Sequence, residues 1–144
     1  MKAQFYLGTM YREGKGVTQD YSKSLDWYLK AAEYGESKAQ HNVALFYHNG
    51  ISVDRDIETA VNWYTKAADQ NYIPSQINIA KLYYNGDGVE KNIKEAITWW
   101  KKAANLGSKG AQHNLGLMYF LGQGIEQDFS KAMEWYLQAA KQCS

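Results

Sequence analysis

Residues 111–140 read AQHNLGLMYFLGQGIEQDFSKAMEWYLQAA, and the same arrangement recurs along the chain at intervals of 36 residues. Its tryptophan, for example, recurs as Trp27, Trp63, Trp99 and Trp135. Four copies account for all 144 residues, and we place the repeats at about 1–36, 37–72, 73–108 and 109–144. A period of this length predicts stacked structural repeats, here forming one domain over residues 1–144.

Each repeat predicts two helices, which we call helix A and helix B. In the first repeat, helix A has an apolar face spaced at intervals of three and four, formed by Phe5, Leu7, Met10 and Tyr11. Gly14 and Gly16 end this helix because residues without a Cβ readily adopt positive φ. Asp20 is placed as the N-cap of helix B, and Gly35 ends it. The chain is therefore predicted to be all-α, with eight helices.

One position of helix A holds only small residues, which are Gly8, Ala44, Ala80 and Gly116. Glycine inside a helix costs about 1 kcal/mol relative to alanine, so propensity does not explain it. We expect helices A and B to approach closely here, with the four tryptophan rings filling the space beside the crossing.

Local departures from the pattern occur in the second and third repeats. Ser52 stands where the other repeats have their second glycine, and we expect a different turn because serine does not adopt positive φ cheaply. Asn71 replaces the glycine at the end of helix B, and Pro74 lies in the first turn of the next helix A. Asn92 replaces the aspartate cap, with Glu95 completing a pair like a capping box.

Composition excludes several partners. Sixteen basic and fifteen acidic residues are spread along the chain, so no strong field favours nucleic acid. No apolar run approaches the roughly 18 residues that span a bilayer, and no leader precedes the repeats. We expect a soluble chain without membrane insertion, while the compartment stays open. Cys143 has no second cysteine for a disulfide or a zinc site.

The repeated pattern is Ala-Gln-x-x-Leu-Gly-x-x-Tyr, Gly-x-Gly-Val/Ile, Asp-x-x-Lys-Ala and Trp-Tyr-x-x-Ala-Ala. It covers the chain in four copies and resembles the Sel1-like repeat family, a relative of the tetratricopeptide repeat. The resemblance implies antiparallel helix pairs in a right-handed superhelix, a solenoid with A helices on its concave side and B helices on its convex side. It also implies a non-enzymatic adaptor or scaffold that binds a protein or peptide.

Three alternative functions remain from the same resemblance. Members of the family act in toxin neutralisation, so an immunity-type inhibitor of a toxin or enzyme is one. A branch with a cysteine pair in each repeat has been linked to β-lactam binding, but Cys143 alone does not match it. The chain could also be an architectural segment of a longer scaffold.

We find no catalytic or cofactor-binding motif. The Gly-x-Gly turns follow helices and lack a third glycine, so they do not form a nucleotide loop. His41 and His48 lie two turns apart on one helix, about 10 Å, and His113 is two repeats away. This spacing predicts no metal site.

The resemblance places five positions of each helix A on the concave groove, and we take the site residues from the fifth, ninth, twelfth and thirteenth residues of each repeat. Because these positions vary between repeats, we predict that they bind the partner. In the last three repeats the predicted site residues are His41, Leu45, His48, Asn49, Ile77, Lys81, Tyr84, Asn85, His113, Leu117, Phe120 and Leu121. Apolar side chains would anchor an extended peptide, and Asn49 and Asn85 would hold its backbone. The alternative is that Leu117, Phe120 and Leu121 only pack against a neighbouring helix A.

The last helix B carries apolar residues that no later helix covers, namely Met133, Trp135, Tyr136 and Leu137. Terminal repeats normally need polar outer faces. Either the chain is a segment of a longer array, or another copy stacks on its end.

Overall fold

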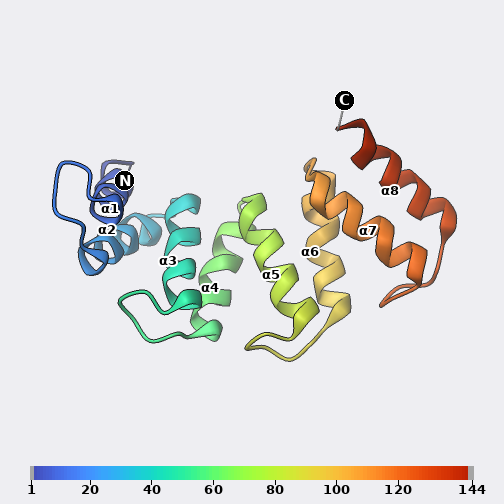
Figure 1. Ribbon diagram of the computed structural model, residues 1–144, viewed down its shortest axis with the longest axis horizontal. Helices are drawn as coiled ribbons and strands as arrows, with labels where there is room; N and C mark the ends of the chain where they lie inside the picture. The colour runs from blue at the N-terminus through green and yellow to red at the C-terminus, as the bar shows by residue number, and fades with distance from the viewer. Residues whose placement is uncertain (1, 143–144) are drawn as a thin grey trace. The chain divides into compact units, whose positions relative to one another are not determined.

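The computed structural model describes residues 2–142, and within this range it holds eight helices and no strand (Figure 1). The helices are α1 (Lys2–Glu13), α2 (Tyr21–Glu33), α3 (Ser37–Asn49), α4 (Ile57–Ala68), α5 (Ile73–Asn85), α6 (Ile93–Asn105), α7 (Lys109–Leu121) and α8 (Phe129–Lys141). The odd-numbered helices are the predicted A helices and the even-numbered ones the B helices, which confirms the all-α repeat architecture. Cys143 lies outside the described residues.

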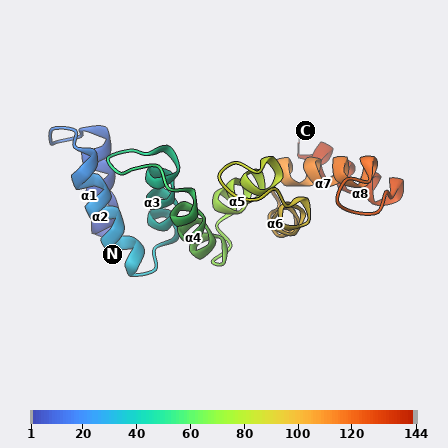
Figure 2. The same cartoon turned by 90° about the horizontal axis from the view of Figure 1, so that it is seen from below.

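The chain divides into two compact units, with the boundary between Ser75 and Gln76 in the first turn of α5. In the first unit α1 packs on α2, α2 on α3, and α3 on α4. In the second unit α6 packs on α7, and α7 on α8. Figure 2 shows the same eight helices after a turn of 90°, seen from below. Within residues 2–142, no helix has the length and apolar character needed to cross a membrane.

Every helix B begins at a side-chain cap, as predicted. The carboxylate of Asp20 accepts a hydrogen bond from the amide of Lys23 at 3.1 Å, and Asp56, Asn92 and Asp128 each accept the equivalent bond. The amide of each cap donates to a tyrosine carbonyl nine residues earlier, at 2.9 Å in all four repeats. The backbone amide of Asn92 therefore donates to the carbonyl of Tyr83. In the predicted capping box, the same amide would have donated to the side chain of Glu95.

The turn at Ser52 does not differ from the others, so the prediction of a distinct conformation was wrong. Ser52 has φ +57°, close to the values at the equivalent glycines Gly16, Gly88 and Gly124. The turn is held on both sides, because the amide of Ile51 donates to Phe46 and that of Asp56 donates to Tyr47. Ser52 therefore carries backbone strain that a glycine would not. Asn71 adopts φ +66°, and Pro74 lies in the first turn of α5, both as predicted.

The close approach of helices A and B is confirmed, but tyrosine occupies it where tryptophan was predicted. A Cβ on Gly8 would lie 2.7 Å from the ring of Tyr28, and one on Gly116 would lie 2.8 Å from the ring of Tyr136. Three of the four tryptophans instead stack under lysines about one turn further along helix B. The ammonium nitrogens of Lys30, Lys66 and Lys102 each lie 4.4 Å from the ring centroids of Trp27, Trp63 and Trp99.

We expect Ser52→Gly to raise the free energy of unfolding by about 0.5 to 1 kcal/mol, because it removes the strain of a positive φ. Gly16→Ser, in the equivalent turn of the same unit, should lower it by a similar amount, since a Cβ at Gly16 meets only the Met10 methyl group at 3.5 Å. Urea unfolding of both variants measures the effect. Changes of the same sign would show that φ does not control these turns.

We expect Gly8→Ala to destabilise the protein by about 1 to 2 kcal/mol, although alanine is the better helix former, because the Tyr28 ring is fully buried and has no room to move. Gly110→Ala is the matched control. A Cβ on Gly110 meets no atom within 4 Å, so helix propensity should stabilise that variant by up to about 1 kcal/mol. Thermal unfolding of both proteins tests the contrast, which stabilisation by Gly8→Ala would refute.

Candidate functional site

In the first unit, His41 is part of the helix packing. Its side chain is only 9% exposed, and its Nδ1 lies 2.7 Å from the hydroxyl of Ser75. The ring centroid lies 5.4 Å from that of Tyr64 and 5.2 Å from that of Tyr72. Burial lowers the pKa of His41 to about 4, so the ring is neutral at physiological pH.

The other predicted site residues of α3 are more accessible. His48 is half-buried, and its Nδ1 lies 2.9 Å from the hydroxyl of Tyr64, whose ring therefore contacts both histidines of this helix. Leu45 is also half-buried, while Asn49 at the end of α3 is exposed. Tyr64 thus fixes the orientation of His48, and Asn49 is the exposed polar group of this set.

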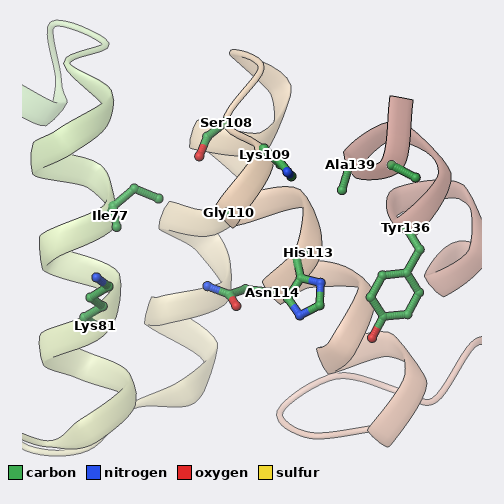
Figure 3. A pocket seen from close by; sticks show the side chains of 10 residues that line it. Ile77, Lys81, Ser108, Lys109, Gly110, His113, Asn114, Tyr136 and Ala139 are labelled. Carbon is green, nitrogen blue, oxygen red and sulfur yellow. The ribbon is translucent and has the colours of Figure 1, made fainter. Parts of the chain in front are cut away.

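In the second unit, three predicted site residues meet at a pocket of 740 Å³ (Figure 3). Ile77 and Lys81 reach it from α5, and His113 reaches it from α7. The ring of His113 lies 5.5 Å from that of Tyr136 on α8, at an interplanar angle of 54°. The complete lining is Ile77, Lys81, Ser108, Lys109, Gly110, His113, Asn114, Tyr136, Ala139 and Ala140.

The pocket combines an apolar surface with positive charge. Ile77, Tyr136 and the alanines of α8 supply the apolar part, and Lys81 and Lys109 supply two exposed ammonium groups. None of the ten lining residues is acidic. The start of α7 adds the positive end of a helix dipole, capped by the hydroxyl of Ser108, which accepts from the amide of Ala111. The arrangement suits a ligand that carries an apolar group beside an acidic one.

The remaining predicted residues of this unit lie outside the pocket. The Tyr84 hydroxyl donates to Oε1 of Gln123 at 3.2 Å, and its ring packs on Trp100. Asn85 and Leu121 are exposed and Leu117 is half-buried. Phe120 is exposed, and its ring centroid lies 5.5 Å from that of Phe129 on helix α8.

Sequence reasoning missed Lys109, Asn114 and Tyr136 as pocket residues. Asparagine stands at the position of Asn114 in three of the repeats and an aromatic residue at that of Tyr136 in all four, so both had the signature of structural positions. The prediction also considered helix A alone, whereas this pocket includes a face of helix B. Among the described residues, no group of three His, Cys, Asp or Glu side chains is arranged to hold a metal ion.

Comparison with known proteins gives one family. The sequence profile of the Sel1 repeat matches residues 2–35, 37–72, 73–108 and 110–142. A Sel1 repeat protein from Oxalobacter formigenes is 37% identical and superposes with a TM-score of 0.93, over 99% of this chain and 59% of that protein. A protective antigen of uropathogenic Escherichia coli with an SLR fold is 36% identical, with a TM-score of 0.91 over 98% of this chain and 30% of that protein.

A third solved structure is more distant. Helicobacter pylori cysteine rich protein B is 28% identical, with a TM-score of 0.63 over 76% of this chain and 90% of that protein. No protein with a curated description matches the chain. The chain spans less than two thirds of the length of the Oxalobacter and Escherichia coli proteins. The feature that it shares with all three structures is the helical-repeat fold.

We expect acid to destabilise the protein through His41. Its folded pKa of about 4 lies below the ordinary value of 6.5, so between these values the unfolded chain binds a proton that the folded chain does not. The free energy of unfolding should therefore fall by about 2 to 3 kcal/mol as the pH drops from 7 to 4.5.

The control is His41→Gln, which cannot titrate in this window. Glu13 and Asp56, whose pKa values are lowered by hydrogen bonds to Lys15 and to Thr59 respectively, contribute equally to both proteins. Denaturant unfolding at several pH values gives the two profiles, and parallel profiles would contradict the assignment.

Proposed function

Because the chain belongs to the Sel1 repeat family, we propose that it is a non-enzymatic protein-interaction module, an adaptor or scaffold whose helix-A face binds a peptide or a loop of a partner protein. Sel1 repeat proteins are generally modules of this kind, and the fold is typically non-catalytic. We further propose that the four repeats act as one domain over residues 1–144, with the two compact units as its halves.

The observation that carries the proposal is the convergence of Ile77, Lys81 and His113 on one pocket. These residues occupy positions that vary between the repeats, and the side chains of Lys81 and His113 are exposed. A volume of 740 Å³ accommodates one or two side chains of a partner. Phe120, Leu121 and Asn85 extend the exposed part of the surface within the same unit.

The chemistry of the pocket favours an acidic partner segment with an apolar residue next to the acid. Lys81 and Lys109 would attract a carboxylate, while Ile77 and Tyr136 would cover the apolar side chain. In the first unit, Asn49 and His48 would provide hydrogen bonds to a partner backbone. The alternative function uses the same binding surface. If the partner is an enzyme or a toxin, the protein is an immunity-type inhibitor and not an adaptor.

We expect a photo-crosslinking amino acid at His113 to capture the partner from a lysate of the source organism, because this side chain lines the pocket. The same amino acid at Lys94, exposed on α6, is the control position. With the captured protein purified, Lys81→Glu should weaken its affinity about 10-fold or more, since it reverses a charge in the pocket. Lys94→Glu should change the affinity less than about 2-fold.

Titration by isothermal calorimetry measures both affinities. Equal effects of the two charge reversals, or capture only at Lys94, would show that the pocket is not the binding site. Loss of a captured enzyme's activity on binding would identify the inhibitor function.

A further inference from the structure

Helix α8 exposes residues whose equivalents in α2 and α6 are buried. Met133 is 60% exposed, whereas its equivalents Leu25 and Ile97 are 5% and 4% exposed. The same contrast holds at Ala140, which is exposed although the equivalent alanines at the ends of α2 and α6 are buried. Phe129 and Leu137 continue the exposed stripe at intervals of four residues.

Helix α1 shows the complementary deviation. Met10 is 37% exposed, whereas its equivalents Phe46 and Met118 are 3% and 2% exposed. Ala3 is exposed while its equivalents in α3 and α7 are fully buried. Tyr6 and Val17 add further exposed apolar surface to this end. We call the exposed side of α1 the head face and that of α8 the tail face.

The interior of the chain shows what covers a tail face. In the first unit the face of α2 that is equivalent to the tail face packs on α3, in a buried cluster that includes Leu25, Tyr28, Ala32, Val43 and Phe46. The ring of Phe46 lies between two rings of α2, with centroids 6.4 Å from that of Tyr21 and 5.9 Å from that of Tyr28. The covering element is therefore a helix A that inserts one large apolar side chain.

One hydrogen bond recurs in this interface. Nε2 of Gln40 donates to the carbonyl of Ala32 at 3.1 Å, and Nε2 of Gln112 donates to the carbonyl of Ala104 at 3.2 Å. The equivalent donor on the head face is Gln4, and the equivalent acceptor on the tail face is the carbonyl of Ala140.

The tail face also contains a hollow of the appropriate kind. It has a volume of 290 Å³ and is lined by Phe120, Phe129, Ala132, Met133 and Tyr136. Phe129 and Tyr136 are the equivalents of Tyr21 and Tyr28, the two residues that hold Phe46. The equivalent of Phe46 on the head face is Met10, an unbranched side chain that adapts to such a hollow.

We propose that copies of this chain stack head to tail, with the head face of one copy on the tail face of the next and Met10 inserted between Phe129 and Tyr136. The occupant is a second copy because its head face carries the equivalents of the residues with which α3 covers α2 and α7 covers α6. The formal net charge of +1 gives little repulsion between copies. Since the two faces differ, the contact is heterologous, and association continues beyond the dimer.

The test uses two variants of the 144-residue chain, Met10→Asp on the head face and Met133→Asp on the tail face. Both side chains are more than one third exposed, so folding should tolerate the changes, which circular dichroism verifies. Sedimentation velocity should show a concentration-dependent series of oligomers for the unmodified chain. Each variant alone should associate about 30-fold more weakly or worse, because a carboxylate then sits in the apolar contact.

An equimolar mixture of the two variants is decisive. The intact tail of Met10→Asp matches the intact head of Met133→Asp, so the mixture should form a dimer and no larger species. Leu106→Asp, at an exposed apolar position on neither face, is the control and should associate like the unmodified chain.

Three outcomes would overturn the proposal. The first is that the unmodified chain stays monomeric up to about 1 mM, and the second is that the mixture of variants stays monomeric. The third is that Met10→Asp alone still dimerises, which would indicate a symmetric tail-to-tail contact. Partner binding at Lys81 and His113 is measured separately, so failure of stacking leaves the proposed function intact.

Discussion

The close approach of helices A and B is the constraint on which the rest of the structure depends. At Gly8 the backbone of α1 lies directly against the ring of Tyr28, and the absence of a Cβ makes this possible. The same ring then positions groups on helix A, because its hydroxyl lies 2.8 Å from that of Thr9. In the second repeat the hydroxyl of Tyr64 bonds His48 in the same way. The contact that fixes the helix spacing thus also orients side chains of the candidate binding surface.

In the last repeat the same aromatic position serves two surfaces at once. Tyr136 packs against Gly116, yet it is only half-buried. One side of its ring faces His113 in the larger pocket, and the ring also lines the hollow beside Phe129 and Met133. Where a neighbouring helix covers this position, as at Tyr28, the ring is core. Whether the tyrosine at this repeat position is a core or a surface residue therefore depends on whether a following helix A packs on its helix B.

How far sequence predicts this molecule depends on whether the cause of a feature is local. The caps at Asp20 and Asn92 and the left-handed residue Asn71 follow from neighbouring residues, and they were predicted correctly. His41 has the spacing of a groove residue, but its burial comes from Ser75 and Tyr72, more than thirty residues away. Ser52 resembles a break in the pattern, yet flanking backbone hydrogen bonds impose the positive φ. Periodicity therefore predicts the helices and their order, and leaves open which variable positions are free to bind.

The bond from each cap amide to a tyrosine carbonyl nine residues earlier sets how this chain can change length. Substitutions in the turn leave that bond intact, as the serine in the second repeat demonstrates. Removing one residue from the turn would instead rotate helix B by about 100° relative to helix A and carry the tyrosine of the crossing away from the core. Such a chain tolerates drift in the identity of its turn residues, but it grows or shortens only by whole repeats.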